Sequence, residues 1–542
     1  MTLRLDRRQL IHAAMYGLGA LSLPAVGSIL AARGFTHGVA SGEPGTNSVL
    51  LWTRCVADRD VRLRVEVARD VGFTRIVAHG ETLAEIQRDC TARVTVEGLE
   101  PGRWYFYRFI APDGGMSVTG RTRTLPANDV SRFGIGLFSC ANIGFGWFNA
   151  YAHACERNDL DVIVHVGDYF YEYGVGSYPD EKSAVPGRLM EPANETVSLA
   201  DYRLRYASYR LDPDLQRLHQ FYPMIAQWDD HEFANDAWKD GAENHQPATE
   251  GEWSVRKAIA ERVYREWMPV SDSRWREYQI GSLATLFKLE TRISGRDEPP
   301  NLEAVAMKGR DNLARALAEF RDGALNAPSR TLLGTEQEAW LRAALRRSTT
   351  LKTRWQVVAQ QVVMGEVVMP EEAVKWVGPN PPDYIRRRLQ VGLAAARAGL
   401  PYNLDSWGGY PAARRRLLED AANANANLIV LAGDSHNAWA QNLSVGPKAV
   451  GVEFATHSVS SPGFEYNLPA ASPRDVARAI LATNPGTVYM DASRRGYTSL
   501  MLTPEAAVGQ FHFLKTVRER STALDETVAF RTRPGLRKLE PA

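Results

Sequence analysis

The sequence predicts an α/β protein in which a layered α/β domain follows a smaller all-β sandwich. Short β-rich segments fill residues 33–128, whereas strands alternate with helical segments across residues 129–520. The chain has 542 residues, which exceeds the size at which a single hydrophobic core keeps growing. Hydrophobic residues make up 44% of it, enough to fill two cores.

Residues 1–32 have the pattern of an export signal. Arg7 and Arg8 precede an apolar run at 13–32 that is rich in Gly and Ala, which is typical of twin-arginine signals. A transmembrane anchor is the alternative, but the run is barely long enough and is interrupted by Gly and Pro. We therefore expect export by the twin-arginine machinery to the periplasm or the medium, with no anchor after signal removal.

The charge balance argues against two classes of binding partner, and the cysteine content limits disulfide bonding. Lys and Arg number 64 against 63 Asp and Glu, so the sequence has neither the excess of basic residues expected for nucleic-acid binding nor a polybasic lipid-binding segment. Four cysteines exclude a dense disulfide framework. Cys55 and Cys90 could form a bridge outside the cell, and their spacing leaves this question open.

The sandwich is predicted from runs rich in Val, Leu, Tyr and Phe that are separated by turn residues. These runs are 48–52, 62–68, 91–97 and 103–110. Residues 98–102, followed by Trp104-Tyr105-Phe106-Tyr107, resemble the strand corner of fibronectin type III modules, in which a tyrosine packs back over the turn. The sandwich is therefore expected to be fibronectin type III-like.

Helical periodicity and strand-like runs alternate in the second part of the chain. The expected helices are 199–209, 252–267, 310–325 and 335–348, and the expected later strands are 284–291, 355–364, 450–455 and 498–502. Thr335 and Glu338 have the spacing of a capping box. We expect residues 174–196 to form a long loop that could cover a site, and residues 521–542 to form a C-terminal tail.

Polar residues directly follow several apolar runs of strand length. The runs are 133–138, 161–166, 222–227 and 428–432. The polar strings are Ser139-Cys140, Gly167-Asp168-Tyr169-Phe170-Tyr171, Trp228-Asp229-Asp230-His231-Glu232, Asn235-Asp236 and Gly433-Asp434-Ser435-His436. Ligands bind beyond the carboxyl ends of strands in open α/β sheets, so we expect these strings to meet in one pocket.

The residue types in these strings favour a metal site. Asp168 could bridge two cations beside the phenol of Tyr171, and a thiolate at Cys140 requires a metal or another positive neighbour. Asp434 and His436, two residues apart in an extended segment, would point the same way. Each string alone has a simpler explanation: a helix cap, a buried structural thiol or a solvated acidic turn. One metal site accounts for all of them.

With these motifs, the chain resembles the PhoD family of alkaline phosphatases and phosphodiesterases, secreted relatives of the calcineurin-like phosphatases. The likeness runs from the string at 35–44 through the sandwich to Asp405-Ser406-Trp407 and the region 450–463. It implies a layered β-sandwich metallophosphoesterase domain. The chain departs from the common pattern at Gly408 and at His457, and the latter could alter substrate fit.

The resemblance also implies the metals and their ligands. One ferric iron (Fe3+) would be held by Cys140, Asp168, Tyr171 and His436. One or two calcium ions (Ca2+) would share Asp168 and bind Asp230 and Asp434, with Asn235 as a further ligand. Thiolate and tyrosinate suit the trivalent ion, whereas calcium prefers hard oxygen ligands.

The expected activity is hydrolysis of phosphate mono- or diesters by metal-activated water. His231 would protonate the leaving oxygen or only orient a carboxylate, while Glu172, Tyr173 and Asp229 would orient ligands. Two alternatives remain at this point. One is a phospholipase D-like phosphodiesterase acting on phospholipid, and the other is a surface-binding protein that the metals stabilise without turnover.

Overall fold

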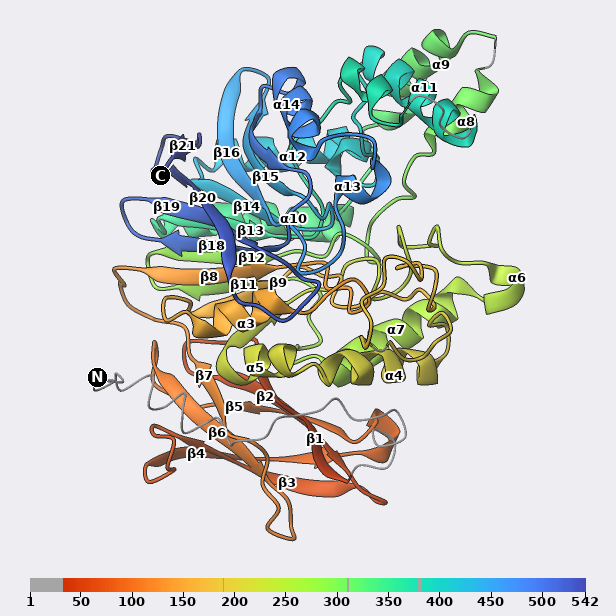
Figure 1. Ribbon diagram of the computed structural model, residues 1–542. Helices are drawn as coiled ribbons and strands as arrows, with labels where there is room; N and C mark the ends of the chain where they lie inside the picture. Colours follow the sequence, from red (N-terminus) through yellow and green to blue (C-terminus); the bar gives the residue numbers. More distant parts are fainter. Residues whose placement is uncertain (1–32, 189, 310, 379–382) are drawn as a thin grey trace, which may run out of the picture.

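The computed structural model describes residues 33–188, 190–309, 311–378 and 383–542, and three β-sheets organise them (Figure 1). The expected signal at 1–32 lies outside the described residues. The largest sheet has ten strands in the order β21-β20-β19-β18-β8-β9-β10-β1-β2-β5. A second sheet has seven strands in the order β11-β12-β13-β14-β16-β15-β17, and a third has four in the order β4-β3-β6-β7.

The ten-stranded sheet contains the strands that carry most of the expected site. In spatial order its strands are β21 (Glu540–Pro541), β20 (Leu524–Thr532), β19 (Ala507–Leu514), β18 (Gly496–Leu502), β8 (Phe133–Phe138), β9 (Val162–His165), β10 (Pro223–Ala226), β1 (Gly34–Gly42), β2 (Val49–Val56) and β5 (Thr91–Val96). β8, β9, β10 and β1 run parallel, so their carboxyl ends meet at one edge. β8, β9 and β10 are buried along their whole lengths, which is why the sequence shows them as unbroken apolar runs.

The seven-stranded sheet packs face to face against this one. Its strands are β11 (Arg276–Ile280), β12 (Ala284–Lys288), β13 (Trp355–Ala359), β14 (Leu428–Ala432), β16 (Lys448–Ala455), β15 (Ala438–Val445) and β17 (Thr487–Asp491). Ile135 and Leu137 of β8 share one apolar core with Val357 of β13 and Ile429 of β14. β12, β13, β14 and β16 are parallel, so this sheet also brings several carboxyl ends to one edge.

Helices cover the outer faces of the two sheets and make the arrangement four layers deep (Figure 1). The ten-stranded sheet is covered by α3 (Asn149–Glu156), α4 (Leu199–Arg210), α5 (Pro213–Phe221) and α7 (Trp253–Trp267), and the seven-stranded sheet by α10 (Gly334–Thr350) and α12 (Pro411–Asn423). A lobe at the upper right of Figure 1 contains α8 (Leu302–Lys308), α9 (Leu313–Phe320) and α11 (Asp383–Arg397). The shorter elements are η1 (Ile86–Arg88), α6 (Pro247–Glu250), η2 (Arg321–Leu325), η3 (Glu371–Lys375), η4 (Trp407–Gly409), α13 (Phe464–Asn467) and α14 (Pro473–Thr483).

The N-terminal sandwich is built partly from the large sheet. Its second layer is formed by β4 (Ile76–Ala84), β3 (Val61–Ala68), β6 (Trp104–Ile110) and β7 (Gly120–Arg123). This layer packs on β1, β2 and β5 through side chains such as Val39, Leu51 and Tyr107. Because β1 also pairs with β10, the backbone hydrogen bonding continues from the sandwich into the α/β part.

The predicted layered α/β architecture with an N-terminal sandwich is confirmed. The Tyr105 hydroxyl accepts a hydrogen bond from the Glu100 N–H at 2.8 Å, so this tyrosine does pack back over its turn. Strands β1, β4 and β7 of the N-terminal part were not predicted from the sequence, nor were β11, β15, β17 and β19 of the α/β part. β1 lies inside the large sheet, whereas β4 has alternating exposed residues that weaken its apolar signal.

Two local predictions turn out differently. The capping box is wrong because α10 begins at Gly334, which places Thr335 inside the helix. Thr331 caps it instead: its hydroxyl accepts from the Gly334 N–H at 2.8 Å and donates to Glu338 at 2.7 Å. The segment expected to be a C-terminal tail contains β20 and β21, which extend the large sheet.

Cys55 and Cys90 lie opposite each other where β2 pairs with the start of β5. The Cys55 N–H donates to the Cys90 carbonyl at 2.9 Å. All four cysteines belong to the described residues, and each is a free, buried thiol. Burial raises the pKa of Cys55 to about 11, so this thiol is protonated at neutral pH.

Candidate metal centre

The polar strings converge at the edge where β8, β9, β10 and β14 end. Four of the expected ligands have left-handed backbone conformations, which are uncommon for residues other than glycine. They are Cys140 (φ 61°), Asp168 (φ 51°), Asp434 (φ 63°) and His436 (φ 61°). Such strained residues cluster at functional sites, where the surrounding structure holds them in place.

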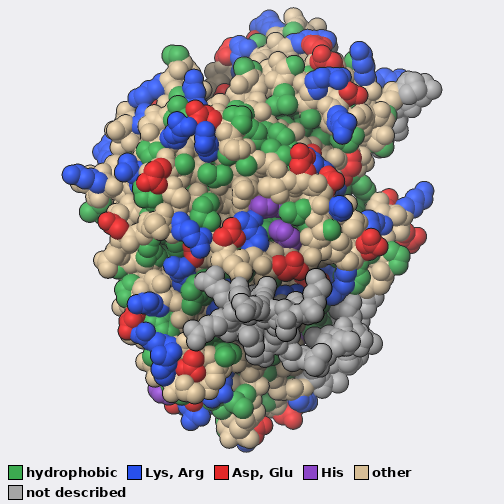
Figure 2. Space-filling model, turned by 60° about the vertical axis from the view of Figure 1, so that its left-hand side comes forward, with side chains coloured by type: hydrophobic (Ala, Val, Ile, Leu, Met, Phe, Trp, Pro, Cys, Tyr) green, Lys and Arg blue, Asp and Glu red, His purple; other side chains and the backbone are tan. Residues whose placement is uncertain are grey.

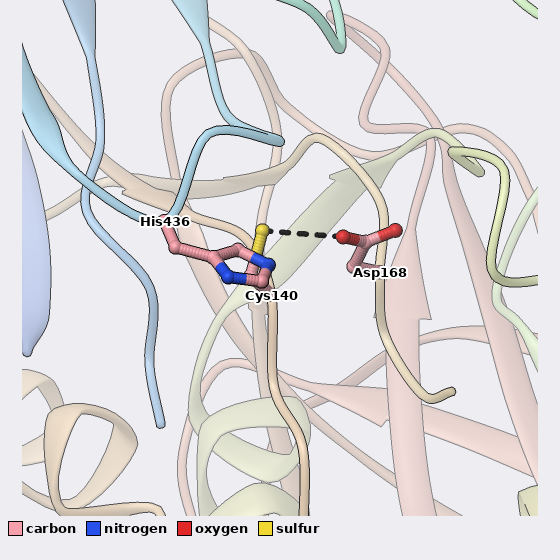
Figure 3. A group of neighbouring side chains, drawn as sticks. All are labelled: Cys140, Asp168 and His436. Carbon is pink, nitrogen blue, oxygen red and sulfur yellow. Dashed lines mark hydrogen bonds between the residues drawn. The ribbon is translucent and has the colours of Figure 1, made fainter. Parts of the chain in front are cut away.

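Cys140, Asp168, Tyr171 and His436, here called the Cys140 group, form a connected set of donor atoms. The Cys140 Sγ lies 3.3 Å from Asp168 Oδ2, as Figure 3 shows. The Tyr171 hydroxyl lies 3.2 Å from the same carboxylate oxygen and 2.9 Å from His436 Nε2. Donor atoms of Cys140, Asp168 and His436 all lie within 4.8 Å of one another.

The hydrogen bond made by Nδ1 fixes the tautomer of His436. Nδ1 lies 2.7 Å from the Pro462 carbonyl, which can only accept, so Nδ1 carries the proton. Burial lowers the pKa of His436 to about 3, which keeps the ring neutral. Nε2 therefore has a free lone pair directed toward Tyr171, as a metal-ligating histidine requires.

The protonation of the Cys140 group shows that it lacks positive charge. Burial raises the pKa values of the Cys140 thiol, the Asp168 carboxyl and the Tyr171 phenol well above their usual ranges. Asp168 Oδ1 is buried and has no hydrogen-bond partner. A cation placed among these atoms would displace the protons and satisfy the unpaired oxygen, so the donor set fits a metal ion.

A second set of carboxylates, Asp229, Asp230, Asp405 and Asp434, surrounds the fully buried guanidinium of Arg292; we call these five residues the Arg292 group. Arg292 lies 3.3 Å from Asp230, 2.6 Å from Asp405 and 2.9 Å from Asp434, and it also donates to Asp229. Asp229, Asp230 and Asp434 offer oxygens within 4.8 Å of one another. This is a hard, oxygen-only donor set.

Burial and Arg292 act against each other in this group. Burial disfavours the charge on Asp230, but Arg292 and His231 outweigh it and lower the pKa of Asp230 to about 2. At Asp434 burial prevails over Arg292 and raises the pKa to about 7. Neighbouring carboxyl groups with well-separated pKa values are characteristic of functional sites.

His231 lies between the two groups. It forms a possible cation-binding cluster with Asp168 and Asp230. Its Nδ1 is 2.7 Å from the Glu172 carboxylate, and its ring packs on Tyr171 at 4.2 Å between centroids. Burial opposes charge on the ring, yet Glu172, Asp230 and Asp168 raise its pKa well above the usual value. His231 is therefore protonated at neutral pH.

Asn235 lies at the margin of this arrangement. Its backbone N–H donates to Glu172 at 2.8 Å, and its side-chain amide donates to Glu243 at 3.2 Å. The neighbouring Asp236 N–H donates to Asp230 Oδ2 at 2.6 Å. The structure therefore brings together seven of the eight expected site residues and leaves the Asn235 side chain facing another acidic residue.

Several residues that hold the centre together were not assigned a role from the sequence. The buried Glu232 carboxylate accepts from the N–H groups of Asp168, Tyr169 and Asp229 and so joins the loops after β9 and β10. Ser461 donates to the Tyr171 hydroxyl at 2.8 Å. Arg292 follows β12 in the string Leu289-Glu290-Thr291-Arg292-Ile293, where a single arginine has no spacing signal.

Other expectations concern residues near the centre. The loop at 174–196 does lie beside it, since Tyr178 packs 5.5 Å from Tyr171 between ring centroids. His457 is different: it is buried against Phe513 and its Nε2 lies 3.1 Å from the His512 carbonyl. Because its side chain is buried in the core, an effect of His457 on substrate fit would have to be indirect.

These donors define the class of protein: a hydrolase whose acidic, histidine-containing centre lies at the edge of two packed sheets. Comparisons with known proteins agree. Residues 133–511 match the family model described as PhoD-like phosphatase, and residues 23–126 match its N-terminal domain model. The chain is 33% identical over 534 residues to alkaline phosphatase D of Bacillus subtilis, covering 93% of this chain and 82% of that protein.

A solved structure supports the same conclusion. The structure of PhoD superimposes with a TM-score of 0.76 at 29% identity and covers 94% of this chain and 92% of the other. The chain belongs to the PhoD-like phosphatase family and is a phosphoesterase that acts on phosphate esters. This result favours the enzyme over the non-catalytic binding protein. Within the described ranges, no helix has the length and apolar character needed to cross a bilayer.

Proposed function

We propose that this chain is an exported alkaline phosphatase or phosphodiesterase that uses one ferric iron and one or two calcium ions. The observation that supports it most is the overlap of three donor clusters: Asp168 belongs to two of them and Asp230 to two. Shared carboxylates are what a multinuclear centre needs, because one residue can serve two ions.

Each group of donors fits one kind of ion. The Cys140 group offers a thiol, a phenol and an imidazole, which suit Fe3+, and the Arg292 group together with Asp168 offers the oxygens that suit Ca2+. Asp230 and Asp434 would be the calcium ligands, with Asn235 entering only if its amide turned from Glu243. When bound, such ions supply Lewis acidity that neutralises phosphoryl charge and activates water.

The protein's own residues would handle the proton on the leaving group. His231 donates from Nδ1 to the Glu172 carboxylate, so a protonated ring has one further N–H, at Nε2, to give. Glu172, Asp230 and Asp168 raise the pKa of His231 and so favour the protonated ring. Glu172 is held in turn by the Asn235 N–H and by Asn244 at 2.9 Å, which fixes the imidazole in place.

The test replaces His231 with asparagine and follows two substrates. If His231 is the acid, kcat should fall by a factor of roughly 10²–10⁴ for an alkyl ester with a poor leaving group, and much less for p-nitrophenyl phosphate, whose leaving group needs no proton. His79, an exposed histidine of the sandwich, gives the control variant His79→Asn. An equal loss on both substrates would assign His231 a purely orienting role.

Metal analysis tests the metals themselves. Purified protein should contain iron and calcium, and a tyrosinate-to-iron charge-transfer colour should disappear in Tyr171→Phe. Hydrolysis of p-nitrophenyl phosphate and bis-p-nitrophenyl phosphate should both need these ions. A colourless protein that is fully active with another metal would contradict the iron assignment.

The proposal of export depends on Arg7, Arg8 and the apolar run that follows them. Replacing both arginines with lysine should retain the protein in the cytoplasm, and activity in the periplasmic or medium fraction measures this. Unchanged export of that variant would exclude the twin-arginine route.

A further inference from the structure

We infer that a cavity beside His436 binds an apolar substituent of the substrate. The cavity has a volume of about 370 Å³. Its apolar walls are formed by Met369, Trp376, Leu389, Phe464, Leu468 and Ile480, and we call it the Trp376 cavity. This inference rests on the proposed phosphoesterase function, because it specifies which substrates that centre prefers.

The Trp376 cavity adjoins the metal centre through His436, which belongs to both. Ser435, His436, Asn437 and Pro462 belong to its lining. His436 is thus shared: Nδ1 is held by the Pro462 carbonyl on the cavity side, while Nε2 faces Tyr171 among the donors. A phosphoryl group at the donors would lie next to the opening of the cavity, with an ester substituent able to enter it.

A neighbouring cavity has a more acidic lining. Its volume is about 890 Å³, and its lining includes the acidic residues Asp236, Glu243, Glu298, Glu303 and Asp405. The two cavities share Met369, Arg388, Tyr402 and Asn467 as a common wall. An apolar group would leave the acidic side chains poorly solvated, whereas the Trp376 cavity offers it a matching surface.

The surrounding surface fits an apolar ligand that enters from solvent. Tyr402, in the common wall, is 44% exposed. Figure 2 shows hydrophobic side chains gathered above the histidine atoms that reach the surface on this face. The packing of Phe464 edge-on against Trp439 and Tyr402 supports one wall of the opening.

Alkylphosphonates of increasing chain length test the inference on the metal-loaded enzyme. They carry the phosphoryl-like head group and cannot be hydrolysed, so both inhibition and calorimetric binding can be measured. Each added methylene should tighten binding by about fourfold until the cavity is filled. Inhibition that does not depend on chain length overturns the inference.

Matched variants test whether the dependence on chain length arises in the Trp376 cavity. Leu468→Asn keeps the branching of the side chain but makes the half-buried wall polar, so octylphosphonate should bind at least tenfold more weakly and methylphosphonate within twofold of the parent. Leu389→Asn should act in the same way from the facing wall. Val374→Asn, just outside the lining, should change neither ligand.

Equal effects of Leu468→Asn and Val374→Asn on octylphosphonate would also overturn the inference. Different results would contradict the inference and the proposed function. If phosphate esters are hydrolysed but chain length has no effect, only the Trp376 cavity is misassigned. If the loaded protein hydrolyses no phosphate ester, the proposed function itself is wrong and the inference falls with it.

Discussion

The two halves of the metal centre handle buried charge in opposite ways. In the Arg292 group the protein supplies its own cation, and the guanidinium contacts all four carboxylates. The Cys140 group has no such partner, and its thiol, phenol and carboxyl have pKa values raised by burial. The charge of the first half is partly compensated by Arg292 as folded, whereas the second half depends more strongly on an external cation.

The largest effect should come from the residue that both halves need. Asp168→Asn removes a charge that belongs to two clusters, so iron and calcium should both be lost and kcat/KM should fall by a factor of about 10³ or more. Metal content and ester hydrolysis measure this, with the exposed Asp180→Asn as control. Retention of full activity would show that Asp168 is not shared.

Removing Arg292 should make the Arg292 group depend on an external cation, as the Cys140 group does. Arg292→Met removes the cation that contacts four carboxylates, although Asp405 keeps its ion pair with Arg296. The free energy of unfolding in chelator should fall by about 3–5 kcal/mol. Added calcium should then stabilise the variant more than it stabilises the parent, because the cluster now lacks charge compensation. Denaturant unfolding with and without calcium measures the stabilisation of the variant and of the parent. An equal response to calcium would mean that the Arg292 group does not bind it.

A milder substitution should weaken the binding of iron without weakening that of calcium. Cys140→Ser replaces the thiol by a harder and less acidic donor, so iron affinity should drop by roughly 10- to 100-fold, while calcium affinity changes little. Competition titrations measure both constants. Cys55→Ser, a similar change in the N-terminal sandwich, is the control and should leave both constants unaltered. Parallel loss of the two ions would argue against separable sites.

The last prediction concerns stability and a buried carboxyl group outside the centre, Glu453, whose partners are backbone N–H groups. Burial raises the pKa of Glu453 from 4.5 to about 7, although the Met364 and Gly365 N–H groups oppose the shift. Between pH 4.5 and 7 the folded state therefore keeps a proton that the unfolded chain has lost. This contribution makes stability fall as pH rises through that window, by roughly 2–3 kcal/mol in total, and it is constant above it.

Glu453→Gln should abolish that part of the pH dependence. The difference in unfolding free energy between variant and parent should shift in favour of the variant as pH rises from 5 to 7, as measured by urea denaturation at several pH values. A difference that stays constant with pH would show that Glu453 is ionised throughout.

Much of the centre could be predicted from the sequence because its donors follow completely buried strands. The runs that form β8 and β14 are apolar along their whole length, and Cys140, Asp434 and His436 come directly after them. Parallel strands then bring these loops to one edge. Arg292 could not be predicted in the same way, since its role depends on carboxylates that arrive from three other segments.

In the fold, too, some features could be predicted from the sequence and others could not. Strands with strong apolar patterns were predicted, but the pairing of β1 with β10 was not, because register between distant segments leaves no local pattern. The capping box failed for a related reason. A threonine four positions earlier reached the same glutamate, and sequence spacing alone does not distinguish the two.

The ten-stranded sheet has a consequence for how the enzyme is made. Its middle strands lie between β1 and β2, from the early part of the chain, and β18 to β20, which are synthesised some 450 residues later. A ribosome-bound nascent chain therefore lacks one flank of the sheet that supports Cys140 and Asp168. We expect the centre to form only after synthesis of β18 to β20, so that metal loading follows translation.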